Sequence, residues 1–304
     1  MNAAVVVALL AAAASPEGVV YDGAFWKQWS DGKAEVDTYK LKQSRYGEAR
    51  DGVVVAVFVT EPWSAAKLVK DDAAAGGDRL NVLKLHTLSS FQTGIYDYHM
   101  ATSAFVALQP LRGLAPGGVL KVAFSSQEWC GQVYHEVVDD GRDSSEVIRS
   151  YFAGESAVRP VARESGPVLV EDALMLWARG LSGPTLPLPT TTTTVRFQSS
   201  LERSRLSHTP VARVDATVSH VAHGSVVVPA GRFVGDSYRI VAGDRTIDVV
   251  VERGGARRVL KVESKDASLE LVKTDRLPYW QMTKRSDDAA RAALGLAPTP
   301  VIKD

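Results

Sequence analysis

Residues 120 to 136 read Leu-Lys-Val-Ala-Phe-Ser-Ser-Gln-Glu-Trp-Cys-Gly-Gln-Val-Tyr-His-Glu, and this stretch indicates the fold class most clearly. Apolar side chains at every second position from Leu120 to Phe124 alternate with small or polar ones, as in a strand with one buried face. A second run begins after Gly131, and glycine suits a bulge between two runs of one strand. The stretch therefore predicts a bulged β-strand that turns Trp129 and Cys130 to unusual faces.

Short strands and turns recur on both sides of this stretch. Asp51-Gly52 is a hairpin signal, and the nearly wholly apolar run 53–60 is typical of a strand covered on both faces. Between positions 237 and 273, short strand-like runs are separated by turn pairs such as Gly254-Gly255, which is the pattern of a meander. The chain is therefore predicted to be mainly β, with a large antiparallel sheet.

Helical patterns are few. Residues 168–181 have helical spacing and end near Gly180, which suits the position after a helix. Residues 18–32 predict a first strand or a short helix, so one or two short helices are expected. Residues 195–207 and 211–221 are interpreted as a hairpin around Pro210.

The N-terminus resembles a secretory signal. Residues 1–16 read Met-Asn-Ala-Ala-Val-Val-Val-Ala-Leu-Leu-Ala-Ala-Ala-Ala-Ser-Pro, an apolar run that ends in small residues, with a cleavage site expected near Ala14 or Ser15. No Lys or Arg precedes the run, and the alternative is a buried N-terminal strand or helix. The run is too short to span a bilayer, and no other apolar stretch predicts a membrane span. An exported protein is therefore expected, which in a bacterium would be periplasmic or secreted.

These patterns divide the chain. The expected parts are a signal peptide at 1–15, a β-rich domain at 18–283 and a polar tail at 284–304. Within the domain we expect an N-terminal half at 18–155, a helix and Pro/Thr-rich connection at 156–194, and a C-terminal meander at 195–283.

Composition excludes some classes of function. The 304 residues carry 35 Lys and Arg against 35 Asp and Glu, so the zero net charge gives no reason to expect a nucleic-acid partner. A single cysteine excludes an internal disulfide framework. No motif predicts a cofactor.

Cys130 is a weak catalytic candidate. A thiol enzyme would use Cys130 as nucleophile, His135 as base, and Glu128 or Glu136 to orient the base. Positions 130 and 135 fall on opposite faces of a regular strand, so this chemistry depends on the bulge. The alternative is a cysteine buried beside Trp129, because free cysteines are among the most buried residues.

A metal site is not expected. His220 and His223 lie three residues apart, which places them on opposite faces of a strand. A zinc site would therefore need a turn at this point and ligands from elsewhere. The alternative is the polar end of a strand.

Several segments of the N-terminal half resemble a group of uncharacterised exported bacterial proteins. The similarity covers roughly positions 20 to 155. The matching segments are Phe25-Trp26, Asp31 to Glu35, Gln43 to Gly47, Phe58 to Pro62, Thr93 to Tyr96 and Ser125 to Gly131. Val228 to Gly231 and the meander after it resemble the DUF3108-type exported domain, which implies a curled, half-barrel-like sheet. Some members carry the name septum formation inhibitor Maf. Maf proteins are cytoplasmic α/β nucleotide pyrophosphatases, whose Ser-x-Ser-Pro-Arg-Arg motif this chain lacks.

Two functions follow from these patterns. The first is a non-enzymatic envelope protein whose curled sheet binds an apolar ligand, a lipid or a lipoprotein partner. Its groove would be lined by aromatic side chains, whose alternative role is core packing. The candidate ligand-binding residues are Trp26, Tyr46, Trp63, Tyr96 and Trp129. The second function is a hydrolase or thiol enzyme centred on Cys130.

Overall fold

The stretch around Cys130 folds as a hairpin of two strands. β6 (Val119–Glu128) and β7 (Gly131–Asp139) pair antiparallel, and Trp129-Cys130 forms the turn between them. Gly131 adopts φ +147°, and a Cβ added there would lie 2.6 Å from a neighbouring aromatic ring. The predicted single bulged strand is therefore wrong, because the glycine permits a tight reversal of the chain.

The structure, a computed structural model, describes residues 18–164 and 166–298. The expected signal peptide and the last six residues lie outside this part. The other strands are β1 (Ala34–Arg45), β2 (Glu48–Ser64), β3 (Val69–Lys70), β4 (Arg79–Thr93), β5 (Tyr96–Ala107), β8 (Ser144–Ser150), β9 (Ala157–Pro160), β10 (Val168–Val170), β11 (Thr192–Gln198), β12 (Arg213–Val228), β13 (Gly231–Ala242), β14 (Arg245–Glu252), β15 (Val259–Ser264) and β16 (Ala267–Leu277).

All sixteen strands in the described residues belong to one sheet. Its order is β10-β11-β12-β13-β14-β15-β16-β1-β2-β4-β5-β6-β7-β8-β9, with β3 paired to β2. The strand pairs are antiparallel except β10 and β11, which are parallel. The predicted mainly β fold with a large antiparallel sheet is confirmed.

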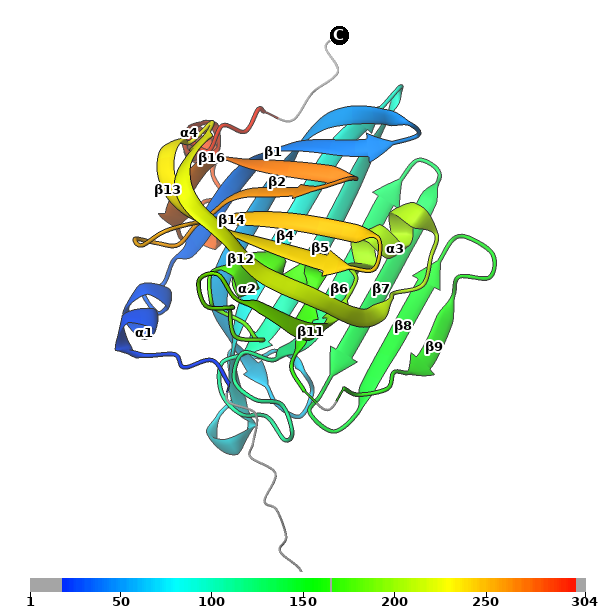
Figure 1. Ribbon diagram of the computed structural model, residues 1–304, viewed down its shortest axis with the longest axis vertical. Helices are drawn as coiled ribbons and strands as arrows, with labels where there is room; N and C mark the ends of the chain where they lie inside the picture. The colour runs from blue at the N-terminus through cyan, green and yellow to red at the C-terminus, as the bar shows by residue number, and fades with distance from the viewer. Residues whose placement is uncertain (1–17, 165, 299–304) are drawn as a thin grey trace, which may run out of the picture.

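Chain connectivity forces this sheet to curl. β9 and β10 are its two ends, and a flat path of fifteen strands would separate them by about 67 Å at 4.8 Å per strand. Yet β9 ends at Pro160 and β10 begins at Val168. Even a fully extended chain between these two residues spans at most about 28 Å, so the two ends of the sheet must lie close together. The sheet therefore folds over itself, and the layer that holds β11, β12 and β14 lies in front of β4 to β6 (Figure 1).

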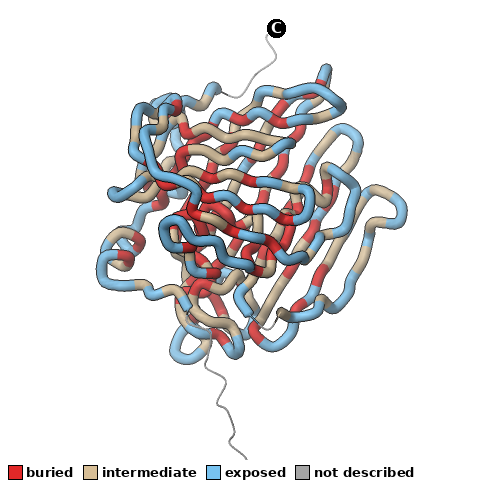
Figure 2. The backbone as a smooth tube through the Cα atoms, viewed as in Figure 1, coloured by how far each residue is buried: buried red, intermediate tan, exposed pale blue. Residues whose placement is uncertain are grey.

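The space between the two layers is filled. Buried segments concentrate where the layers overlap, whereas the hairpin loops are exposed (Figure 2). The helix α2 (Leu174–Ala178) is buried along its whole length, contacts β14, and follows a 3-10 turn (Glu171–Ala173) that contacts β5. The largest fully buried side chains, among them Trp177 and Tyr39, complete this core. The concave face is therefore packed with protein over most of its area.

Four short α-helices occur in the described residues, where the sequence predicts one or two. α1 (Gly23–Trp29) begins at Asp22, whose side chain accepts a hydrogen bond from the N–H of Phe25 (2.9 Å). The predicted helix at 168–181 is shorter, because its first residues form β10 and the 3-10 turn.

α3 (Leu201–Ser207) is the helix that the sequence does not predict. Ser200 caps its first turn through a hydrogen bond from the N–H of Arg203 (3.1 Å), and it ends at His208 in a left-handed conformation. The hairpin predicted around Pro210 is therefore interrupted by a helix, although β11 and β12 do pair. α4 (Asp288–Ala293) lies in the predicted polar tail, and Leu294 after it packs on the outer face of the sheet.

Candidate functional site

A cavity of about 140 Å³ lies where the two ends of the sheet approach each other. Its walls come from β6 and β7 in one layer, from β10 to β12 in the other, and from the loop between β5 and β6. An engineered cavity of about 150 Å³ with apolar walls is known to bind benzene. The cavity therefore has room for an apolar group of about six carbon atoms.

Valines from both layers form the apolar wall. Val122 and Val137 lie on neighbouring strands of the hairpin β6–β7 and are buried. Val168 and Val170 line the cavity from the edge strand β10. On β6 and β7 these side chains alternate with more exposed ones, so this part of the wall is set by the period of two. On β10 the intervening Leu169 is fully buried in the core.

The loop between β5 and β6 closes one end of the cavity through close backbone contacts. The N–H of Val19 donates to the carbonyl of Pro116 (2.8 Å), and the N–H of Gly183 donates to the carbonyl of Gly117 (2.9 Å). Gly117 has φ +88°, and a Cβ there would lie 2.4 Å from Cγ2 of Val19. Only glycine fits this position without displacing the segment that covers the cavity.

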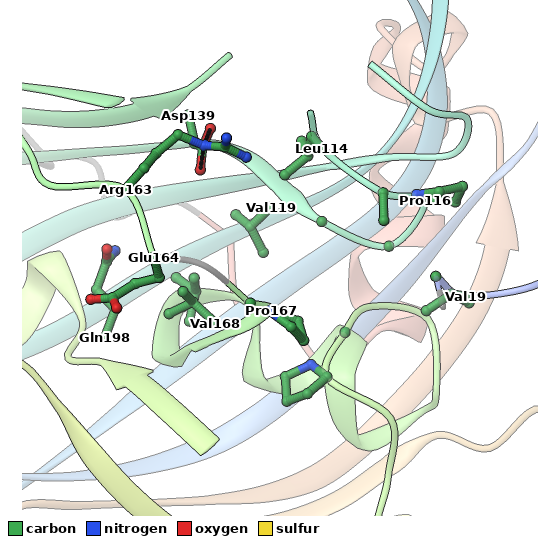
Figure 3. Close-up of a pocket in the computed structure, with 18 of the residues that line it drawn as sticks. Val19, Leu114, Pro116, Val119, Asp139, Arg163, Glu164, Pro167, Val168 and Gln198 are labelled. Atoms are coloured by element: carbon green, nitrogen blue, oxygen red, sulfur yellow. Dashed lines mark hydrogen bonds and ion pairs between the residues drawn. The ribbon is translucent and has the colours of Figure 1, made fainter. Parts of the chain in front are cut away.

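Polar side chains gather at the opposite end of the cavity, as Figure 3 shows. Arg163 Nε donates to Asp139 Oδ1 (3.0 Å), and Glu164 accepts from Arg196 Nη2 (3.1 Å). Gln198 lies at the same end and accepts from Arg213, which also lines the cavity. The cavity is therefore amphipathic, apolar toward the β5–β6 loop and polar toward β11 and β12.

A second, polar hollow of about 280 Å³ adjoins the cavity. The two share Val137, Gln198 and Arg213 as a common wall. Charged groups also line the hollow from the edge of the sheet, namely Glu146 on β8 and Arg159 on β9. Together the cavity and the hollow place an apolar chamber next to a charged one.

Glu146 is held as a carboxylate by two donors. His135 Nε2 donates to Glu146 Oε1 (2.7 Å) and Arg159 Nε donates to Oε2 (2.6 Å). Burial would raise the pKa of Glu146, but these two hydrogen bonds outweigh burial and lower its pKa. Glu146 and Arg159 therefore neutralise each other.

The three catalytic candidates are not brought together. Cys130 is exposed in the β6–β7 turn. His135 is buried and bonded to Glu146, and Glu128 accepts from Arg205 Nη2 (2.8 Å) in a buried ion pair. No hydrogen bond joins the thiol to either side chain in the described chain. The arrangement lacks the contact between nucleophile and base that a thiol enzyme needs.

The five aromatic candidates lie in three places. Trp26 is half-buried on α1, and Trp63 is buried against Phe105, with ring centroids 4.4 Å apart. Tyr46, Tyr96 and Trp129 come together at neighbouring hairpin turns. There the hydroxyl of Tyr96 donates to that of Tyr46 (3.1 Å), and the Tyr96 and Trp129 rings are 6.4 Å apart. Ligand binding by these residues stays a prediction.

The two histidines near position 220 have different surroundings. His220 is buried and donates from Nε2 to Asp236 Oδ1 (3.2 Å), whereas His223 is exposed beyond a register shift in β12. Within the described ranges, no group of three or more His, Cys, Asp or Glu side chains could hold a metal ion.

Sequence reasoning missed the residues that line the cavity and the hollow. They come from segments that are distant in the chain, such as Val122, Glu146 and Arg213. No local motif links them, because they meet only when β9 and β10 approach. The one sequence feature that could have indicated this meeting is the short connection between β9 and β10, because it limits the distance between the two ends of the sheet.

Comparison with known proteins adds little. No protein-family model and no curated protein matches the chain, so the resemblance to DUF3108 domains is not confirmed. A solved structure from Bacteroides fragilis, described as an exported protein with a YmcC-like fold, aligns over 79% of this chain and 95% of that chain. Its sequence identity is 11% and its TM-score is 0.20, which is too low to carry an argument about fold or function. In the part that the structure describes, no helix has the length and apolarity needed to cross a membrane.

Proposed function

We propose that this protein is exported to the bacterial cell envelope and binds a small amphipathic ligand between the two ends of its sheet. The amphipathic cavity is the observation that carries this proposal. Export is supported by the apolar run at the N-terminus. A binding role fits a pocket with apolar walls and a few polar groups at one end, because such groups fix the orientation of a ligand.

The volume limits the ligand. About 140 Å³ is smaller than the roughly 300–1,000 Å³ of pockets that enclose drug-sized molecules. A whole lipid does not fit, and the interior of the curled sheet is packed around α2. The cavity can therefore hold a short-chain amphiphile, or the end of one chain of a larger lipid, but not a whole lipid.

Binding of benzene to the full chain tests the cavity directly. A ligand that binds only the folded state raises the unfolding free energy by about 1.4 kcal/mol at ten times its Kd. We expect benzene to raise the thermal midpoint of the protein in this way. We expect the effect to be lost in Val168→Phe, where the added ring occupies the cavity.

Val158→Phe is the matched control, because Val158 is 65% exposed on β9 and does not line the cavity. It should keep the benzene effect. If benzene leaves the midpoint of the unmodified chain unchanged, or stabilises Val168→Phe equally, the cavity is not a binding site.

A further inference from the structure

Arg213 is a half-buried cation without a carboxylate partner in the described chain. Its Nε and Nη2 donate to Gln198 Oε1 (3.0 and 2.8 Å), and its Nη1 donates to the carbonyl of Ala162 (2.7 Å). All three contacts are to neutral oxygens. Burial lowers the pKa of Arg213 against the attraction of the nearby carboxylates of Glu164, Asp139 and Glu146. Each of these carboxylates is itself paired with another arginine.

The charges around the hollow leave Arg213 unbalanced. Three charged side chains line the hollow: Glu146, Arg159 and Arg213. Glu146 and Arg159 form an ion pair, so the remaining charge on the lining is one guanidinium. A charge that is partly withdrawn from water is costly unless it is paired, so a half-buried guanidinium at a hollow without an ion pair points to a counter-ion supplied by a ligand.

The hydrogen-bonding capacity of Arg213 fits the same conclusion. A guanidinium has five N–H donors, of which the three contacts above use three. One donor remains on each terminal nitrogen. Two donors on a planar group match the two oxygens of a carboxylate or a phosphate monoester.

We propose that the polar hollow is a head-group subsite in which Arg213 binds an anion, so that the ligand is a small amphipathic anion. This inference rests on the proposed function, since the tail of the ligand occupies the adjoining apolar cavity. The common wall of Val137, Gln198 and Arg213 is where head and tail meet. The head is a carboxylate or a phosphate, which share the required chemistry.

Titrations with hexanoate, hexyl phosphate and neutral 1-hexanol test this inference. The three probes share a tail of similar size and differ in the head group. We expect at least one anion to bind about ten-fold or more tightly than 1-hexanol, the factor for a hydrogen bond to a charged group. Comparing hexanoate with hexyl phosphate identifies the head.

Two variants assign the effect to Arg213. Arg213→Gln should lose the preference for the anion while its affinity for 1-hexanol stays within about two-fold, since the valine wall that contacts the tail is unchanged. Arg213→Lys keeps the charge and should retain part of the preference for the anion. This second variant tests the role of the charge even if Arg213→Gln folds poorly. Arg239→Gln is the matched control and should keep the preference, because Arg239 is paired with Asp248 and lines neither the cavity nor the hollow.

The outcomes separate the two proposals. If 1-hexanol and benzene bind but no anion is preferred, or if Arg213→Gln keeps the preference, the head-group subsite is refuted and the cavity stands. If none of the probes binds, the proposed function fails as well.

Discussion

Replacing Asp37 by asparagine should stabilise the fold at neutral and alkaline pH and have little effect near pH 4. Asp37 lies on β1, is 0% exposed, and accepts a hydrogen bond from the Tyr39 hydroxyl (3.2 Å). Its Oδ1 has no hydrogen-bond partner in the described chain. Burial and the neighbouring carboxylate of Glu35 both raise the pKa of Asp37, and the attraction of Arg179 opposes them only in part. The resulting pKa is about 7.

The size and sign of the effect follow from this pKa. The pKa of about 7 in the folded state exceeds the ordinary value of 3.8 by about three units, which corresponds to about 4 kcal/mol. The folded state binds the proton more tightly than the unfolded state. The stabilisation of the fold by protonated Asp37 is therefore fully present below about pH 4, and it is lost as the pH rises to about 7. Asparagine has no proton to lose, so Asp37→Asn escapes this loss.

Urea unfolding between pH 4.5 and 8.5 measures the effect. The difference in unfolding free energy between Asp37→Asn and the unmodified chain should grow by about 1.4 kcal/mol per pH unit between pH 5 and 6.5, and level off above pH 8. Asp51→Asn is the control, because the Asp51 side chain is 76% exposed on the neighbouring strand. A difference for Asp37→Asn that stays constant over the whole pH range would refute the protonation of this buried carboxyl group.

Three further predictions concern packing, a buried ion pair and the thiol. Gly117→Ala should destabilise the protein by about 2 kcal/mol more than Gly47→Ala in chemical unfolding, because both glycines have positive φ but only the first would contact a neighbour. Glu128→Gln should cost about 3 kcal/mol in the same assay, since it leaves the guanidinium of Arg205 buried with a neutral partner; a cost below about 1 kcal/mol would contradict a desolvated pair. Cys130→Ser should change stability by less than about 0.5 kcal/mol and leave benzene binding intact, because the thiol is exposed; loss of binding in calorimetry would instead assign the thiol a role in the site.

Strand periodicity accounts for the part of the fold that was predictable. The alternation from Leu120 to Phe124 and the regular turns of the C-terminal meander are local signals, and the sheet contains strands at both places. α3 was not predictable from the same patterns, because its seven residues are held by the cap at Ser200 and by packing on β5 to β7. The hairpin turn at Gly131 was missed because glycine permits a bulge and a reversal equally.

The buried charges show a second limit of sequence reasoning. Glu35 and Asp37 share the face of β1 that carries Tyr39 and Leu41, so their burial follows from the period of two. Their partner Arg179 follows α2, about 140 residues later in the chain, and only the folded structure places it at Glu35. The cavity and the hollow have the same origin, since their walls meet only through the curl of the sheet.

Native mass spectrometry of the full chain purified from a bacterial envelope fraction tests the central claim most directly. We predict one small amphipathic anion bound per chain, released on denaturation, and absent from Val168→Phe purified in the same way. A chain that is free of ligand, or a ligand retained equally by Val168→Phe, would contradict a binding site between the two ends of the sheet.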